Sequence, residues 1–237
     1  MKFCIIGDSW TGWAAIGESA PEGPTIGNSR YLAPIDNYLE KHGHEVVKNI
    51  SAPGASNFGQ LRQLRYEVDH NQFDYIIWLY TEPIRNIVEF IDTEDCQSQY
   101  PDLSYKNFYE DLEYIQHRDF VYAQRLYKKH KKPFVVIGGA GQINTQDIDY
   151  PFIKYVLPSW AKEITRIDNM PVNCYITFFN NFAKSTEKLK YNKQELLREI
   201  DGIEQYTEYR ENNPDLFHDY YHPSPNLYES WLGRMLQ

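Results

Sequence analysis

Cysteine is scarce in this sequence, and the three copies stand far apart at Cys4, Cys96 and Cys174. An odd number of distant cysteines without a C-x-x-C pair predicts neither a disulfide framework nor a zinc site, so free thiols are expected. Long runs of positive charge are also missing, and the formal net charge is -9. This acidic balance disfavours nucleic acid or an anionic membrane as the main partner and fits a neutral or sugar-like ligand better.

Long apolar runs are missing as well. Only four apolar residues precede Gly7, too few for the apolar region of a secretory signal peptide, and no run approaches membrane-spanning length. We therefore expect a soluble protein that resides in the cytoplasm or in a virus particle. No repeat, low-complexity segment or clear linker divides the 237 residues, which predicts a single domain over residues 1–237.

Short continuous apolar runs recur along the chain and indicate strands that are covered on both faces. They are Phe3–Ile6, Val46–Ile50, Tyr75–Tyr80, Phe134–Ile137 and Cys174–Phe179. Helix-like segments alternate with them: Tyr31–Lys41, Phe58–Val68, Asn107–Lys129, Trp160–Arg166, Lys193–Tyr209 and a last helix that opens with Ser224-Pro225. This alternation predicts an α/β fold with a mostly parallel five-stranded sheet and helices on both sides. Asp119 interrupts the apolar stripe of the long helix, and the sequence offers no account of it.

Three motifs follow predicted strands or precede the last helix. G-D-S ends the first strand at 7–9, S-A-P-G-A-S-N follows the second at 51–57, and D-Y-Y-H-P stands at 219–223. Ligands of an open parallel sheet bind beyond the carboxyl ends of its strands. A serine there becomes a nucleophile when an imidazole accepts its proton and a carboxylate orients the imidazole. Ser9, His222 and Asp219 are the candidates for these roles, and the backbone N–H groups of Ser9 and Gly54 are candidate oxyanion donors.

The stretches G-D-S-W at 7–10, N-I-S-A-P-G-A-S at 49–56 and D-Y-Y-H-P at 219–223 resemble three of the four blocks of the SGNH (GDSL-type) hydrolases. P-G-A-S-N together with T-x-P-x-R is also similar to divergent phage-borne members of that family. The resemblance implies a three-layer, flavodoxin-like fold and hydrolysis of a small ester or O-acetyl group, perhaps on a glycan, through an acyl-enzyme and without a cofactor. By motif position it assigns Ser9 as nucleophile, His222 as base, Asp219 as its orienting partner, and the N–H groups of Ser9 and Gly54 as oxyanion donors.

The remaining block departs from the family pattern. In place of Gly-x-Asn-Asp the chain has L-Y-T-E-P-I-R-N at 79–86, which puts Tyr80 at the glycine and Glu82 at the asparagine. An ionised glutamate repels an oxyanion, and the loss of one donor typically costs about 10²- to 10³-fold in rate. Asn57 is the favoured replacement donor, with Thr81 and Arg85 as alternatives. The candidate substrate-binding residues are Asp8, Trp10, Thr81, Glu82 and Arg85.

Simpler interpretations stay open beside this one. Ser9 can be a turn serine that caps the next helix, and Gly54 can serve turn geometry alone. Asp215, His218, Asp219 and His222 would share one face of a helix and resemble a divalent-metal site, although flanking prolines leave little room and we expect no metal. G-G-A-G at 138–141 lacks the spacing of a phosphate loop and is interpreted as a turn. The second hypothesis for function is a catalytically silent SGNH-fold module with a binding or structural role, for instance in a virus particle, which Glu82 favours.

Overall fold

The computed structural model describes residues 1–8, 34–52, 55–81, 83, 108–138, 150–166, 204–217 and 224–235. Five parallel strands form one sheet in the order β2-β1-β3-β4-β5. Their bounds are β1 Lys2–Ile6, β2 Glu45–Asn49, β3 Tyr75–Tyr80, β4 Phe134–Gly138 and β5 Ile153–Leu157. This is the strand order of flavodoxin-like doubly wound proteins, so the predicted fold class is confirmed.

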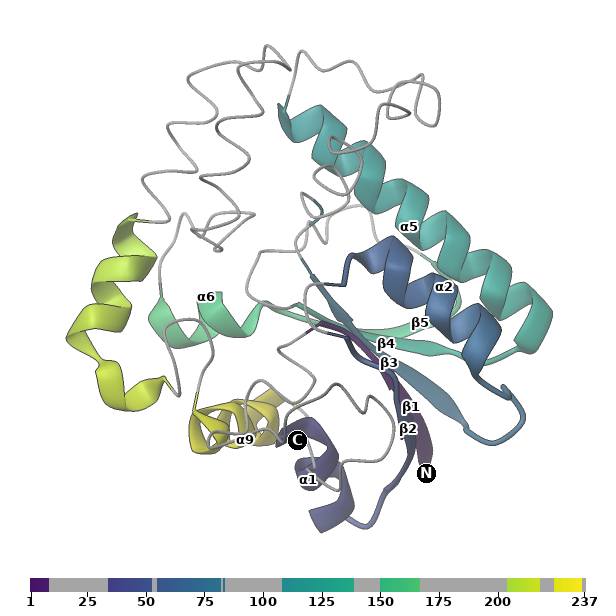
Figure 1. Ribbon diagram of the computed structural model, residues 1–237, viewed down its shortest axis with the longest axis horizontal. Helices are drawn as coiled ribbons and strands as arrows, with labels where there is room; N and C mark the ends of the chain where they lie inside the picture. The colour runs from purple at the N-terminus through teal and green to yellow at the C-terminus, as the bar shows by residue number, and fades with distance from the viewer. Residues whose placement is uncertain are drawn as a thin grey trace, which may run out of the picture.

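Helices cover both faces of the sheet, which makes three layers (Figure 1). One face carries α2 (Asn57–Glu67) and the long α5 (Phe108–His130). The other carries α1 (Pro34–Lys41), α6 (Trp160–Thr165), the 3-10 turn η2 (Pro214–Leu216), α9 (Pro225–Met235) and a helical segment at 204–212.

The alternation of side chains along each strand explains why both faces are apolar. Ile5 and Ile77 point into the cluster beneath α1 and α9, whereas Cys4, Ile76 and Trp78 point into the cluster beneath α2 and α5. A strand that is buried on both faces needs apolar residues at every position. The continuous apolar runs of the sequence are therefore a direct consequence of the three-layer arrangement.

Four of the predicted strands are confirmed to within a residue at each end, and the sheet contains a further strand that was not predicted. The fifth strand of the sheet is β5, an edge strand on which Lys154 and Tyr155 are exposed. Its mixed sequence, I-K-Y-V-L, lacks the continuous apolar character that marks the inner strands. The predicted strand at Cys174–Phe179 lies outside the described residues.

Gly138 ends β4 at a point of close backbone approach. A Cβ atom added there would lie 2.7 Å from the backbone nitrogen of Ser159, the residue that caps α6. Only glycine fits this packing of strand against helix start. Its role in G-G-A-G is therefore steric, and the other three residues of that motif lie outside the described part of the chain.

Cys4 is a free, buried cysteine in the centre of β1, as expected from the sequence. Burial raises the pKa of its thiol to about 12, so it is unreactive in the folded protein. Cys96 and Cys174 lie outside the described residues. None of the helices that the structure describes has the length and apolar character needed to span a membrane.

Candidate active site at the carboxyl end of the sheet

The ends of β1, β2 and β3 meet at the carboxyl end of the sheet. Beyond the strands proper, Ile50 donates its N–H to Ile5 (2.9 Å) and Ala52 donates to Gly7 (3.1 Å), so β1 and β2 stay paired up to Gly7. Ala55 then donates to the carbonyl of Ala52 at 3.1 Å, the i to i+3 bond of a β-turn. This bond brings Ala55 back to Ala52 just before α2 begins, and positions 53 and 54 lie outside the described residues.

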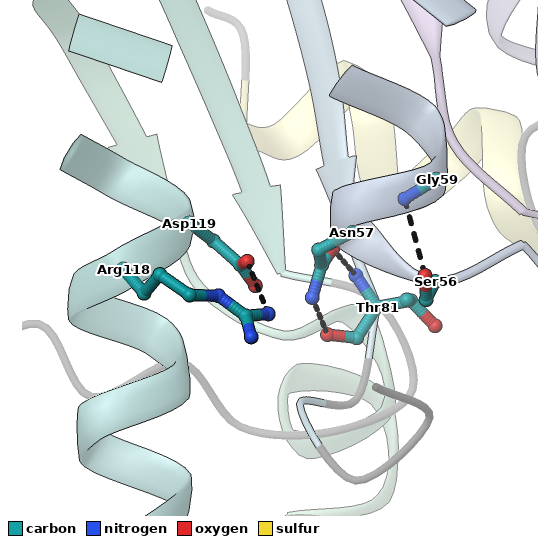
Figure 2. A network of polar contacts seen from close by, with 6 residues as sticks. All are labelled: Ser56, Asn57, Gly59, Thr81, Arg118 and Asp119. Atoms are coloured by element: carbon teal, nitrogen blue, oxygen red, sulfur yellow. Dashed lines mark hydrogen bonds and ion pairs between the residues drawn. The ribbon is translucent and has the colours of Figure 1, made fainter. Parts of the chain in front are cut away.

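The side chain of Asn57, at the start of α2, holds the backbone of Thr81 at the end of β3 (Figure 2). Its Nδ2 donates to the Thr81 carbonyl at 2.8 Å, and its Oδ1 accepts from the Thr81 N–H at 2.9 Å. Asn57 is fully buried and Thr81 nearly so. These two bonds satisfy both backbone polar groups of the buried residue Thr81 and fasten the start of α2 to the end of β3.

Asp8 joins the same group of residues from β1. The Thr81 hydroxyl donates to Oδ2 of Asp8 at 2.7 Å, and the Asp8 side chain is fully buried. This distance is the usual length of an O–H···O hydrogen bond. Asp8, Asn57 and Thr81, which we call the carboxyl-end network, thus connect the segments that follow β1, β2 and β3. Asp8 is also the residue directly before Ser9.

Ser56 fixes where α2 begins and therefore where Asn57 lies. It has extended backbone angles (φ -75°, ψ 161°), and its hydroxyl accepts the N–H of Gly59 at 3.1 Å, as expected of an N-cap (Figure 2). A Cβ atom on residue 59 would lie 3.3 Å from that hydroxyl, closer than side chains normally approach. The S-N-F-G sequence thus determines the helix start and the direction of the Asn57 side chain.

Two charged residues of α5, Arg118 and Asp119, extend toward this network (Figure 2). The Arg118 guanidinium pairs with Asp119 at 3.1 Å and lies 5.4 Å from the ring centroid of Phe58 on α2. Asp119 is fully buried. Neither residue was predicted as a site residue, although the interruption of the apolar stripe at Asp119 was the available signal.

Tyr80, which replaces the family glycine, points away from the strand ends and into the core. Its ring stacks on Phe120 (centroids 5.6 Å apart) and packs edge-on against Trp78. Burial and, to a smaller extent, the Asp119 charge raise the pKa of Tyr80 well above its usual value, so the phenol is neutral. The larger residue is accommodated by the aromatic layer beneath α5.

Of the predicted site residues, the structure brings Asp8, Asn57 and Thr81 together. Ser9, Trp10, Gly54, Glu82, Arg85, Asp219 and His222 lie outside the described residues, so the catalytic roles assigned to them stay predictions. The oxyanion role of Asn57 also stays a prediction. Its amide nitrogen carries two hydrogens, and the Thr81 carbonyl takes one of them.

The helix that the metal alternative requires does not run through Phe217. Pro214–Leu216 is a single 3-10 turn, and Phe217 is already extended (φ -119°, ψ 139°). Asp215 therefore does not share one continuous helix with positions 218–222. Among the described residues there is also no group of three or more potential metal ligands.

The segment that carries Asp219 and His222 is anchored at both of its described ends. Ser224 donates its N–H to the carbonyl of Leu216 at 2.8 Å, and the Ser224 hydroxyl accepts the N–H of Leu227 at 3.4 Å. The predicted start of the last helix at Ser224-Pro225 is thereby confirmed. Phe217 packs beside Tyr206 and Trp231 in the core, which holds the first end of the segment against the sheet.

Comparison with known proteins gives structural likeness alone. No family model and no curated protein matches this chain. The chain is similar to the crystal structure of psychrotrophic esterase EstA from Pseudoalteromonas sp., with 11% identity, 99% of this chain and 96% of that chain covered, and a TM-score of 0.42. It is also similar to Axe2, an acetylxylan esterase from Geobacillus stearothermophilus, at 15% identity, 98% and 90% coverage and a TM-score of 0.39. The activity of this chain therefore has to be argued from its own residues.

Proposed function

We propose that this protein is an SGNH-type serine hydrolase that cleaves a small ester or an O-acetyl group, with an acetylated glycan as the expected kind of substrate. The observation that carries the proposal is the carboxyl-end network. It joins the residue before Ser9, the helix after the glycine turn and the end of β3. Asp8 and Asn57 belong to or adjoin the resembling stretches at 7–10 and 49–56, and Thr81 belongs to the stretch at 79–86 that departs from the family pattern. A buried polar network there suits a site that must hold its loops in fixed positions.

In the proposed reaction His222 accepts the proton of the Ser9 hydroxyl while the serine oxygen attacks the acyl carbonyl. Asp219 holds the imidazole in the required tautomer. The backbone N–H groups of Ser9 and Gly54 stabilise the tetrahedral oxyanion. His222 then protonates the departing alcohol, and a water molecule, deprotonated by the same imidazole, releases the acyl group from Ser9. The scheme requires no metal and no organic cofactor.

Asn57 is the proposed third donor in place of the missing block asparagine. It is held beside Thr81, the neighbour of Glu82, by the two bonds to the Thr81 backbone. Its second amide hydrogen is the one assigned to the oxyanion. Thr81 and Arg85 remain the alternatives, but the Thr81 hydroxyl donates its hydrogen to Asp8 and is thereby committed elsewhere.

The second candidate function is a catalytically silent module of the same fold. The replacement of two block residues, by Tyr80 and Glu82, favours it. Tyr80 is built into the core, so the chain is adapted to at least one of these changes. Both candidates predict the same fold and differ only in the chemistry at Ser9.

The test is covalent labelling by a fluorophosphonate probe, combined with turnover of p-nitrophenyl acetate. We expect the Ser9→Ala variant to lose both. Ser51→Ala is the matched control, because Ser51 follows β2 at the same end of the sheet and its buried hydroxyl has no hydrogen-bond partner; it should label like the wild type. A folded wild-type protein that neither labels nor turns over substrate would support the silent module.

A further inference from the structure

A shallow hollow of about 220 Å³ lies on the outer side of α2, away from the buried Asn57. The residues that line it are spaced three, four, seven and eight positions apart and so share one face of the helix. They are Gly59, Arg62, Gln63, Tyr66 and Glu67. None of the five belongs to the carboxyl-end network, so the hollow is a separate feature.

The Tyr66 ring forms an exposed aromatic platform at this hollow. It is 70% exposed, the most exposed aromatic side chain among the described residues. The Arg65 guanidinium lies over one face of the ring, 5.2 Å from its centroid. Arg65 also interacts with Tyr122 of α5, which raises the pKa of the guanidinium. The ring is thereby supported from one side, which leaves its other face for a ligand.

The polar groups around the hollow include both donors and acceptors. Gln63 lines the hollow with a side-chain oxygen that is buried and has no hydrogen-bond partner, so a ligand hydroxyl reaches it when the side chain rotates. Arg62 supplies donors and Glu67 supplies acceptors. The lining itself carries one positive and one negative side chain, Arg62 and Glu67, so a neutral ligand rich in hydroxyl groups can use both its donors and its acceptors there.

We propose that this hollow binds one unit of a neutral oligosaccharide. The apolar C–H face of a sugar ring packs on the electron-rich face of a tyrosine, while its hydroxyl groups both donate and accept hydrogen bonds. The planar guanidinium, amide and carboxylate groups match neighbouring hydroxyls in pairs. The volume is smaller than that of a pocket for a drug-sized ligand, which starts near 300 Å³. A single sugar of a longer chain, bound weakly, is therefore the expected occupant.

The proposal does not depend on catalysis at Ser9, and its test uses ligands that contain no ester. Xylohexaose, cellohexaose and mannohexaose are titrated separately into the full chain, and binding is measured by saturation-transfer NMR and calorimetry. We expect at least one of them to bind the wild type. Tyr66→Ala should weaken that binding by about tenfold or more, because it removes the aromatic platform. Tyr66→Phe keeps the ring and should bind as the wild type does.

Tyr155→Ala is the matched control. Tyr155 is 67% exposed on β5 and does not line the hollow, so its removal should leave binding unchanged. Gln63→Leu tests the polar half of the site and should also weaken binding. The proposal is overturned if none of the three oligosaccharides binds the wild type, or if the Tyr66→Ala variant binds with unchanged affinity.

Discussion

The two ends of the sheet differ in whether their buried polar side chains are hydrogen-bonded. At the carboxyl end, Asp8, Asn57 and Thr81 are buried and hydrogen-bonded to one another at 2.7–2.9 Å. At the amino end, His70 precedes β3 and His130 ends α5, and their rings stack with centroids 3.6 Å apart. The Nε2 atoms of both histidines are buried without a hydrogen-bond partner.

This difference shows what each end can do. Mutually satisfied polar groups cost little to bury and hold three loops in fixed positions. Protonation of the two stacked imidazoles is disfavoured in the folded protein, because partial burial and the neighbouring positive groups oppose a charge there. The carboxyl end is therefore suited to a site, and the amino end makes stability sensitive to pH.

The largest effect is expected from Asn57→Ala, which breaks the carboxyl-end network at its centre. The N–H and carbonyl of the buried Thr81 peptide would lose their partners, at a cost of about 2–4 kcal/mol in the free energy of unfolding. Denaturant titration measures this loss. Gln63→Ala on the same helix is the control and should change stability by less than about 0.5 kcal/mol. A loss below about 1 kcal/mol for Asn57→Ala would mean that water replaces both bonds.

A smaller effect is expected from Thr81→Val, which keeps the volume and the backbone bonds but removes the hydroxyl that donates to Asp8. The cost is about 1–3 kcal/mol, because the fully buried carboxyl group of Asp8 loses a hydrogen-bond partner. If the bond also positions Ser9, kcat should fall while KM stays nearly constant. Thr81→Ser keeps the hydroxyl and should retain most of both stability and rate. Equal behaviour of the two variants would show that the Thr81–Asp8 bond contributes nothing.

The fold was predictable because the sheet is buried on both faces, which makes Phe3–Ile6, Tyr75–Tyr80 and Phe134–Ile137 apolar at every position. The strand β5 was not predicted from the sequence, because it is not buried on both faces. Its exposed Lys154 and Tyr155 face away from the core at the edge of the sheet. The spacing of apolar residues along a sequence reflects which side chains are buried, so a partly exposed edge strand shows only a weak apolar pattern.

The site was predictable only in part. Asp8, Asn57 and Thr81 were predicted to contact the oxyanion or the substrate, and these roles stay predictions; the structure shows in addition that the three residues bind one another. A sequence motif shows which residues lie at the end of a strand. It does not show which of them bind each other, because Thr81 lies 24 positions from Asn57 and 73 positions from Asp8, and only the tertiary fold brings them together. The burial of Asp119 was hidden for the same reason.

The smallest effect is expected from the histidine pair at the amino end, and it concerns pH. Burial lowers the pKa of His70, helped by the nearby charges of His130 and Lys129, while the Val68 backbone and Asp69 act in the other direction. Burial and Lys129 lower the pKa of His130 as well. In the unfolded chain each imidazole binds a proton near pH 6.5. The unfolded state therefore binds more protons than the folded state, and stability is lost as the pH falls through that value.

Denaturant titrations between pH 7.5 and about 5, where the unfolded imidazoles titrate, should show this loss in the wild type and a smaller one in His130→Gln. The control His117→Gln changes an exposed histidine of the same helix and should follow the wild-type curve. Acidic groups that titrate near pH 5 affect all three proteins equally, so the difference between the curves isolates the pair. If His130→Gln and the wild type lose stability in parallel, the stacked histidines accept protons as easily as in the unfolded chain. The contrast between the two ends of the sheet would then rest on the carboxyl-end network alone.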